Sequence, residues 1–316
     1  FAADRRVRTP PAQFAARSYV KPSPYGTVLI MSPWNYPFML TMEPLVGAIA
    51  AGNCCVVKPS AYSPATSAVM RDIISSCLEP GLASVVEGGR AENAALLDER
   101  FDYIFFTGSV AVGTLVMRKA SEHLTPVTLE LGGKSPCIIA ADADLKVAAA
   151  RVVFGKYLNC GQTCVAPDYI LVDERVHDEF LKLVRAQIEE MFGAAPLDNP
   201  QWGKIVNRKH FDRLMGLIDP AKVVVGGQAN AETLQIAPTV LDGVTEDDAV
   251  MGEEIFGPVL PVITYQTLDE AFAIVTGSFA ENAPSVADGC DVYIWDRSGT
   301  HAYGESSTVG ETVRVC

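Results

Sequence analysis

One cysteine near the middle of the chain stands where a nucleophile could act. Cys164 follows a turn that contains Gly161, at the end of an expected helix, and an apolar strand begins a few residues later. We expect this order to place the thiol near the carboxyl edge of a parallel sheet, where α/β enzymes hold their ligands. A free thiol titrates near pH ~8.5, so a nucleophilic role needs a lowered pKa or a neighbouring base. A packed structural thiol explains Cys164 equally well when it is taken alone.

A glutamate upstream could supply the base. Glu130 lies at the end of an expected strand, between Leu129 and Leu131 and directly before Gly132-Gly133. We expect the two leucines to desolvate the carboxylate, which would raise its pKa and make it a better base near neutral pH. An ordinary glutamate at a strand end is the alternative interpretation.

Two further segments could bind an anion. Residues 105–109 predict a strand that ends in a glycine turn and continues into a helix, so that backbone N–H groups point at a phosphate. Only Gly108 and Gly113 match the dinucleotide fingerprint, and a plain strand-to-helix turn remains open. Lys58 is the last residue of another expected apolar strand. A buried ammonium there needs an anion or a hydroxyl-rich ligand as a partner. Alternatively, the side chain of Lys58 simply reaches the surface.

The elements that must position these residues alternate along the chain. Short apolar runs predict strands at residues 28–31, 54–58, 103–106, 127–130, 136–140 and 169–172. Helices are expected from Ser63-Pro64 to about Leu78, from Ser109 to His123, and over residues 176–191. Strands and helices in alternation predict an α/β fold with a largely parallel sheet and right-handed crossovers.

Composition restricts the classes of partner. The net charge of −13 argues against nucleic acid, because binding a phosphate backbone needs a basic face. No apolar run approaches the roughly 18 to 20 residues of a membrane span, and the most apolar stretch, residues 44–57, predicts a buried helix followed by a buried strand. The eight cysteines form no Cys-x-x-Cys pair and the four histidines are scattered, so we expect reduced thiols and no metal site.

Six stretches of the chain form a recognisable series. The stretches are Pro-Trp-Asn-Tyr-Pro-Phe at 33–38, Lys-Pro-Ser at 58–60, Phe-Thr-Gly-Ser at 106–109, Leu-Glu-Leu-Gly-Gly-Lys-Ser-Pro at 129–136, Gly-Gln-Thr-Cys-Val-Ala-Pro-Asp-Tyr at 161–169 and Glu-Glu-Ile-Phe-Gly-Pro at 253–258. Taken together, in this order and at this spacing, they resemble the aldehyde dehydrogenase superfamily over roughly residues 7–276, most closely its shorter class-3-like branch.

The resemblance implies a Rossmann-like parallel-sheet cofactor domain and a second α/β catalytic domain, as in aldehyde dehydrogenases. We assign residues 1–132 to the dinucleotide-binding domain, whose N-terminal part is missing, and residues 133–276 to the catalytic domain with the nucleophile. Residues 277–316 form an atypical tail, in which residues 286–299 predict two strands around a turn. The family implies a homodimer, although its dimer-bridging strands are not recognisable in this tail.

The activity that the resemblance implies is NAD(P)-dependent oxidation of aldehydes to carboxylic acids, through a thiohemiacetal and then a thioester on Cys164. The amide of Asn35 and the backbone N–H of Cys164 would hold the oxyanion, and Glu130 would activate the water that hydrolyses the thioester. The residues implied to bind NAD or NADP are Trp34 beside Asn35, Lys58 at the adenosine ribose, Gly108, Ser109 and Gly113 at the pyrophosphate, and Glu254 with Phe256 at the nicotinamide ribose.

Two positions depart from the family's pattern. The family commonly carries a glutamate after Lys-Pro-Ser, and here Ala61 stands in its place, so NADP should be tolerated beside NAD. Cys160 lies four residues before Cys164, where a small residue without a thiol is usual. It could form a disulfide with Cys164 under oxidation, or it could simply pack in the core.

The partner expected from the resemblance is a small aldehyde, and a cytoplasmic location is taken as the default, with the true N-terminus not seen. A relative that passes its acyl group to coenzyme A is disfavoured, because Glu130 is present to activate water. A chain that binds a dinucleotide but is catalytically incomplete remains the alternative function.

Overall fold

The computed structural model describes residues 3–277, 292–296 and 299–303, and the chain divides into two compact units. Unit 1 covers Phe1–Leu131 and unit 2 covers Gly132–Cys316. Unit 1 begins with the antiparallel pair β1 (Arg5–Val7) and β2 (Ser18–Val20), which are joined through the short 3-10 helix η1 (Pro11–Gln13).

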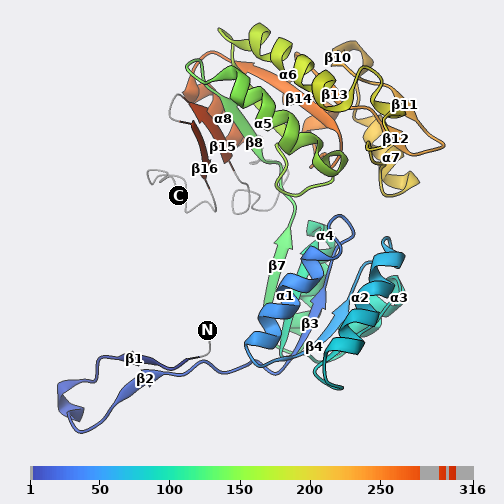
Figure 1. Ribbon diagram of the computed structural model, residues 1–316. Coiled ribbons are helices and arrows are strands. Elements are labelled where there is room, and N and C mark those ends of the chain that lie inside the picture. The colour runs from blue at the N-terminus through green and yellow to red at the C-terminus, as the bar shows by residue number, and fades with distance from the viewer. Residues whose placement is uncertain (1–2, 278–291, 297–298, 304–316) are drawn as a thin grey trace. The chain divides into compact units, whose positions relative to one another are not determined.

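The main part of unit 1 is a five-stranded, fully parallel sheet in the order β5-β4-β3-β6-β7 (Figure 1). Its strands are β3 (Thr27–Met31), β4 (Cys54–Lys58), β5 (Ala83–Val85), β6 (Tyr103–Gly108) and β7 (Val127–Leu131). Its helices are α1 (Met39–Ala50), α2 (Pro64–Cys77), α3 (Arg90–Asp98) and α4 (Val110–Ser121). The parallel α/β fold expected from the sequence is confirmed. The β1–β2 pair, the three-residue strand β5 and the short helix α3 of this unit were not predicted.

Alternating side chains of β3 divide the core of unit 1 into two layers. Val28 and Ile30 pack with α1 and α2 on one face of the sheet, and Leu29 and Met31 pack with α3 and α4 on the other. Successive side chains of a strand point to opposite faces, so an apolar run without alternation predicts a strand buried on both sides.

Two of the expected helices differ in detail from the structure. Helix α2 begins at Pro64 as predicted, but the hydroxyl of Ser63 caps no N–H of the first turn and instead lies 3.5 Å from the carbonyl oxygen of Ser60. Helix α1 was expected to be buried, yet only Thr41 and Leu45 are. Only one stripe of a helix can face a sheet, so apolar residues on its other sides, such as Val46, stay exposed.

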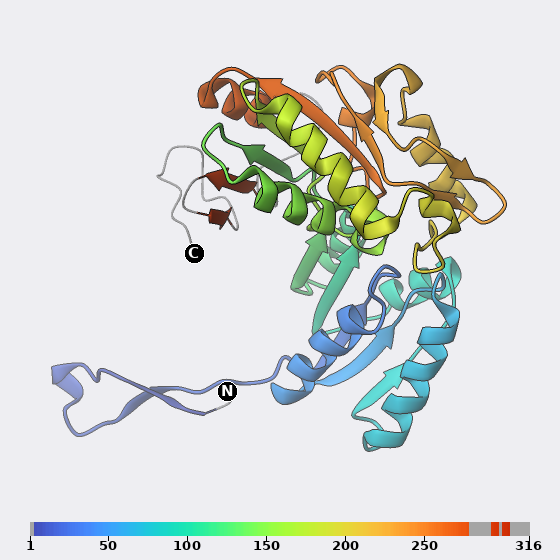
Figure 2. The same cartoon turned by 45° about the horizontal axis from the view of Figure 1, so that its top comes forward.

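Unit 2 is built on a seven-stranded sheet in the order β10-β13-β14-β9-β8-β15-β16. Its strands are β8 (Pro136–Ile139), β9 (Tyr169–Asp173), β10 (Val223–Val225), β13 (Thr239–Leu241), β14 (Val259–Tyr265), β15 (Val292–Asp296) and β16 (Gly299–Tyr303). Its helices are α5 (Leu145–Tyr157), α6 (His177–Phe192), α7 (Arg208–Gly216) and α8 (Leu268–Gly277), and a separate ribbon pairs β11 (Ala229–Asn230) with β12 (Gln235–Ile236). Helices α5 and α6 lie side by side against the sheet (Figure 2).

The central strands of unit 2 run parallel, and the two outermost pairs are antiparallel. Strands β13, β14, β9, β8 and β15 are parallel neighbours, whereas β10 pairs antiparallel with β13 and β16 with β15. The β15–β16 hairpin confirms a two-stranded segment in the tail, although its second strand lies beyond the predicted range and residues 286–291 are outside the described residues. Within the described part of the chain, no helix is long and apolar enough to cross a membrane.

Candidate active site

The predicted cofactor residues of unit 1 lie at the carboxyl edge of its sheet. The chain moves from β3 outward to β4 and β5 and then returns to β6 on the other side of β3. In α/β sheets the ligand crevice opens outside the carboxyl ends at such a topological switch point. Trp34 and Asn35 follow β3, and Gly108 ends β6 directly before Ser109, so both segments flank the switch point.

Lys58 is buried at the end of β4, with 3% of its surface exposed, so the interpretation that it reaches the surface is wrong. Its Nζ donates to the carbonyl oxygens of Pro59 at 2.9 Å and Gly88 at 2.8 Å. Burial lowers the pKa of this ammonium, and the nearby Glu92 opposes the shift. These carbonyls take two of the three N–H donors of the ammonium, which leaves one donor for a ligand hydroxyl.

The start of α4 presents an open helix end. Ser109 is the N-cap residue, its side chain caps no N–H, and residues 109–112 are exposed. The N–H groups of a first helical turn have no partner within the helix and attract an anion.

Gly113 has a different role from the one that the resemblance implied. Its N–H donates to the carbonyl oxygen of Ser109 within the helix, so it is not available to a phosphate. A Cβ at Gly113 would lie 2.7 Å from Cδ2 of Leu131 in β7. The glycine therefore allows α4 to pack closely on the sheet, which is the role of the last glycine in dinucleotide-binding turns.

Glu130 is exposed on β7, and the expected desolvation by its neighbours is wrong. Leu129 and Leu131 pack against the core layer formed with α3 and α4. They cannot cover Glu130, because successive side chains of a strand point to opposite faces. The carboxylate is therefore open to water, which the role of activating water requires.

The loop that carries Cys164 starts with three consecutive residues of positive φ. After α5 the 3-10 turn η2 (Leu158–Gly161) contains Asn159 at φ 52°, Cys160 at φ 55° and Gly161 at φ 73°. A side chain with a Cβ is strained in this left-handed region, which asparagine tolerates better than most residues. The turn redirects the chain so that Cys164 lies half-buried in the following loop.

The side chain of Gln162 fastens this loop to the segment that precedes α7. Gln162 is 4% exposed, and its Nε2 donates to the carbonyl oxygens of Asn159 at 3.1 Å and Lys204 at 3.2 Å. Its Oε1 accepts from the N–H of Val206 at 2.9 Å. Three hydrogen bonds to a buried amide hold the backbone two residues before the nucleophile in one conformation.

Cys164 lies at the amino edge of the sheet of unit 2, so the expected carboxyl edge is wrong. The loop precedes β9, just as Lys134 precedes β8 and Gly257-Pro258 precedes β14. Because these strands are parallel, the segments before them meet at one edge, where the N–H of Asp168 donates to the carbonyl oxygen of Ser135 at 2.8 Å.

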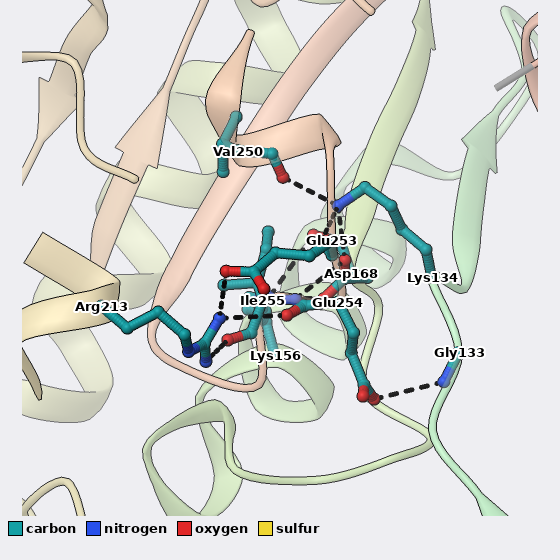
Figure 3. A network of polar contacts seen from close by, with 9 residues as sticks. All are labelled: Gly133, Lys134, Lys156, Asp168, Arg213, Val250, Glu253, Glu254 and Ile255. Atoms are coloured by element: carbon teal, nitrogen blue, oxygen red, sulfur yellow. Dashed lines mark hydrogen bonds and ion pairs between the residues drawn. The ribbon is translucent and has the colours of Figure 1, made fainter. Parts of the chain in front are cut away.

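A buried ion pair holds the segment that carries Glu254 and Phe256 (Figure 3). Lys134 Nζ lies 2.7 Å from Oδ2 of Asp168 and donates to the carbonyl oxygens of Val250 at 2.8 Å and Glu253 at 3.0 Å. All three donors of this ammonium therefore have acceptors, which is the condition under which a buried lysine can remain charged.

Two more charged groups fix the backbone around Glu254. Oδ1 of Asp168 accepts from the N–H of Ile255 at 3.0 Å. Arg213 of α7 donates to the carbonyl oxygens of Glu254 at 3.2 Å and Ile255 at 2.6 Å and to the Glu253 carboxylate at 3.0 Å (Figure 3). The peptide groups on both sides of Glu254 are thus held from separate elements.

The carboxyl group of Glu254 lies against Gly132 and Gly133, the first two residues of unit 2. One oxygen accepts from the N–H of Gly133 at 3.3 Å, and a Cβ at Gly132 would collide with this carboxyl group. Burial and the negative Asp168 raise the pKa of Glu254 to about 7, against the opposing effects of the Gly133 N–H, Lys156 and Arg213. Phe256, two residues on, has φ 49°, a strained conformation that the surrounding bonds sustain.

The nucleophile loop and the Glu254 segment are in direct backbone contact. A Cβ at Gly161 would collide with the carbonyl group of Gly257 and lie 3.0 Å from the nitrogen of Pro258. The two motifs, nearly a hundred residues apart in the sequence, therefore form one rigid part of unit 2.

We expect Gly161→Ala to destabilise unit 2 and to displace the Cys164 loop. The new Cβ meets backbone that cannot rotate away and requires φ 73°, which together cost about 2–4 kcal/mol. The free energy of unfolding in urea and the rate of Cys164 alkylation by iodoacetamide measure the two effects. Gly216→Ala is the matched control, because nothing lies within 4 Å of a Cβ there, and equal behaviour of the two variants would contradict the prediction.

Cys160 is a packed thiol of the core. It is buried, and a Cβ built at Gly203 would lie 3.0 Å from its sulfur. Burial raises the pKa of Cys160 to about 11, so the thiolate that disulfide exchange needs is scarce near neutral pH. Of the two roles considered for Cys160, the structure supports packing.

Four polar residues of this site were not singled out from the sequence: Lys134, Lys156, Asp168 and Arg213. Lys156 could have been recognised from the sequence, because it is a lone charge in the otherwise apolar end of α5. Asp168 could also have been recognised, as a carboxylate directly before a fully buried strand. Arg213 lies on an ordinary amphipathic helix, so nothing in the sequence distinguished it.

Comparisons with known proteins agree with these motifs. The model of the aldehyde dehydrogenase family matches residues 3–283. The chain is 49% identical over 273 residues to 4,4'-diaponeurosporen-aldehyde dehydrogenase of Staphylococcus aureus, a match that covers 86% of this chain and 60% of the relative. It is 46% identical over 258 residues to aldehyde dehydrogenase family 3 member A2 of Mus musculus, over 82% of this chain and 53% of the relative.

Solved structures show the same similarity. A substrate-bound Staphylococcus aureus AldH superposes with a TM-score of 0.87 at 44% identity, covering 93% of this chain and 63% of that one. A Mycobacterium tuberculosis aldehyde dehydrogenase complexed with NAD+ superposes with a TM-score of 0.79 at 33% identity. This match covers 93% of this chain and 60% of that one. The chain therefore spans a little over half of the length of the relatives it matches. With a family match over nearly its whole length and close relatives in the class-3 branch, this chain belongs to the aldehyde dehydrogenase family.

Proposed function

We propose that the chain provides the cofactor-binding and catalytic parts of an enzyme that oxidises aldehydes to carboxylic acids with NAD or NADP, through Cys164. The observation that carries this proposal is the backbone contact between Gly161 and Gly257. It joins the loop of the half-buried thiol to the segment of Glu254 and Phe256, so that a nucleophile and a ribose-binding carboxylate belong to one rigid part.

Unit 1 fits a dinucleotide. The open first turn of α4 can take the pyrophosphate between Gly108 and Ser109, and the remaining N–H of Lys58 can donate to the adenosine ribose. Trp34 belongs to the other segment that flanks the switch point. In unit 2, Glu254 and Phe256 would hold the nicotinamide ribose. Bound NAD or NADP supplies the hydride acceptor for the oxidation.

The first chemical step would be attack by the Cys164 thiolate on the aldehyde carbon. The new C–S bond turns the carbonyl oxygen into an alkoxide, which the amide of Asn35 and the backbone N–H of Cys164 would hold. A preorganised donor of this kind contributes about 3 kcal/mol to a transition state. Asn35 and Glu130 belong to unit 1 and Cys164 to unit 2, so their meeting is part of the proposal.

The second step would release the acid from Cys164. Once the hydride has left, a thioester joins the acyl group to the sulfur, and water must attack its carbonyl carbon. Glu130 would take the proton of that water, for which its exposure on β7 is suitable. The carboxylic acid then leaves and the thiolate is restored.

One assay tests the proposal. The purified 316-residue chain is mixed with NAD or NADP and a medium-chain or aromatic aldehyde, and the absorbance of the reduced nicotinamide is followed. Turnover to the carboxylic acid supports the proposal, and a requirement for coenzyme A would replace it with acyl transfer. Binding of the dinucleotide without turnover would support the alternative, a chain that binds cofactor but is catalytically incomplete.

We expect Ala61→Glu to lower the use of NADP relative to NAD. Ala61 is exposed just past the carboxyl end of β4, three residues after Lys58. A carboxylate there would accept hydrogen bonds from ribose hydroxyls and repel a 2′-phosphate, which should change the ratio of the two kcat/KM values by about tenfold or more. The unsubstituted chain should use both cofactors, and a preference for NAD by several orders of magnitude would contradict this.

We also propose that the protein forms a homodimer in the cytoplasm. A relative 45% identical over 275 residues is named aldehyde dehydrogenase, dimeric NADP-preferring, of Canis lupus familiaris. The cysteines in the described residues form no disulfide, as is usual in a reducing compartment. Light scattering of the purified chain tests the dimer, and cell fractionation tests the location.

A further inference from the structure

The side chain of His177 lies between two carboxyl groups. His177 is the first residue of α6, and its Nδ1 lies 2.9 Å from Oδ1 of the adjacent Asp178. Its Nε2 lies 2.8 Å from Oδ1 of Asp242, which directly follows β13. The side chain of Asp178 is open to water, whereas those of His177 and Asp242 are only 16% and 26% exposed. The partly shielded contact with Asp242 therefore joins the start of α6 to the end of β13.

Both ring nitrogens of His177 must carry a hydrogen for these two contacts to be hydrogen bonds. An ionised carboxylate can only accept, and a neutral imidazole has one N–H and one bare nitrogen. In either neutral tautomer, one nitrogen would therefore point its lone pair at a carboxylate oxygen within hydrogen-bond distance. The geometry fits the imidazolium form, which donates to Asp178 and Asp242 at the same time.

The acidic groups at this end of α6 also favour the imidazolium. Burial lowers the pKa of His177, but the bonds to Asp242 and Asp178 and their charges outweigh it, so the pKa is raised above its ordinary value. Asp178 belongs to α6 itself and Asp242 to the segment after β13, so both elements contribute a negative charge. The other acidic residues near this position in the chain, Glu174 and Glu179, are exposed to water.

The positive charges of the neighbouring segments are paired with other carboxylates. Arg175, in the turn before α6, is bonded to Asp173 at 2.6 Å. Lys222, before β10, accepts through its carbonyl oxygen from the N–H of Asp242 at 2.8 Å, but its ammonium is paired with Asp248. The carboxylate that faces the imidazole is therefore left to the imidazole.

The contact with Asp242 fastens the start of the connection from β13 to β14. Here the N–H of Asp242 is held by Lys222, and the N–H of Val244 donates to a carbonyl oxygen of β14 at 3.3 Å. These backbone bonds do not titrate, and the ion pair of Lys222 with Asp248 keeps its charges through the neutral pH range. Of the bonds named here, the one to His177 is thus the one whose strength depends on pH near neutrality.

We propose that His177 and Asp242 form a pH-dependent clasp, closed while the imidazole is protonated, which fastens the start of the β13–β14 connection to α6. A charge-assisted hydrogen bond is roughly twice as strong as a neutral one. When the imidazole releases its proton to the solvent, one N–H is left for two carboxylates, so one contact is lost and the other is weakened. The connection that leads to Glu254 is then held less tightly at its start.

The sign of the effect follows from the raised pKa of His177. Because the folded protein binds this proton more tightly than the unfolded chain does, protonation and folding support each other. The stability that the clasp contributes is fully present below the ordinary pKa of a histidine, about 6.5, and is lost as the pH rises through the pKa of the folded state.

Nuclear magnetic resonance of the ring nitrogens tests the proposal directly. The 316-residue chain is labelled with ¹⁵N and titrated from about pH 6 to about pH 9, and the signals of His177 are assigned by their absence from His177→Gln. We expect both nitrogens of His177 to be protonated at the acid end and its pKa to lie above the ordinary value of about 6.5. Asp242→Asn should lower this pKa, because an amide carries no charge. A pKa at or below the ordinary value would overturn the proposal, as would a pKa that Asp242→Asn left unchanged.

Thermal unfolding measures what the clasp contributes. Glutamine can donate a bond to Asp242 but carries no charge, so His177→Gln should unfold about 2–4 °C below the unsubstituted chain at pH ~6, and the difference should shrink towards pH ~9. Should His177→Gln fail to fold, Asp242→Asn provides the same comparison, with its deficit again confined to the acid end.

His123→Gln is the matched control, because this histidine is exposed just after α4 in unit 1. Its unfolding temperature should follow that of the unsubstituted chain over the whole pH range. An equal deficit of His177→Gln at both ends of the range would show a merely structural role for His177 and overturn the proposal, as would a deficit that grew with increasing pH.

Discussion

Replacing Cys164 by alanine is expected to lower kcat for aldehyde oxidation by about 10⁴-fold or more, to the limit of detection. Both covalent intermediates of the proposed reaction are formed on this sulfur, and the other thiol of the loop, Cys160, is buried in the core with a raised pKa. Dinucleotide binding should persist, because the proposed cofactor contacts are made by other residues. Steady-state kinetics and NADH fluorescence measure the two quantities on the same preparation.

The control for this variant is a cysteine in the other unit. Cys77 is exposed at the end of α2 in unit 1, so Cys77→Ala should retain full activity. Iodoacetamide should inactivate the unsubstituted chain and Cys77→Ala alike, since the half-buried Cys164 remains in both. Substantial aldehyde oxidation by Cys164→Ala would refute the thiolate mechanism, whatever the effect on stability.

Glu130→Gln should slow release of the acid much more than formation of the thioester. An amide cannot take a proton from water, and a positioned general base typically contributes about 10² to 10⁴ in rate. After rapid mixing, reduced cofactor should appear in a burst equal to the concentration of active sites, followed by a slow steady phase. The unsubstituted chain should show a much faster steady phase.

Glu190→Gln is a suitable control, because this glutamate is exposed near the end of α6 and belongs to none of the motifs of the proposed site. Its kinetics should match those of the unsubstituted chain. A Glu130→Gln variant that lost the burst together with the steady phase would show that the carboxylate acts before the thioester forms. That outcome would assign Glu130 to activation of Cys164 and remove it from the hydrolysis step.

Strands β3, β4, β6, β7, β8 and β9 could be predicted from the sequence because their apolar runs are continuous, whereas β10, β13 and β14 of the second sheet were not predicted. Strand β9 is buried on both faces, so every position but the last is apolar and its bounds are easy to recognise. Helix α2 was recognisable from Pro64 at its first position. Strand β5 was not, because three residues carry too little pattern.

The errors at the candidate site share one cause, which is that sequence neighbours are not spatial neighbours. Leu129 and Leu131 flank Glu130 in the chain but point to the opposite face of β7. Cys164 was expected at the carboxyl edge, yet a residue that precedes a strand lies at its amino edge. Gly113 matched a phosphate-binding pattern, but its contact with Leu131 shows a packing role.

By itself the sequence determined the α/β class, the order of the elements and the residue types able to do the chemistry, because apolar periodicity and motif spacing are local properties of the chain. Only the tertiary structure decided which charges meet. Lys134, Asp168 and Glu254 meet because parallel strands bring the segments before them to one edge, and Lys156 of α5 and Arg213 of α7 reach the same edge from helices. Burial and Coulomb interactions act through space, so the raised pKa of Glu254 has no counterpart in the linear pattern.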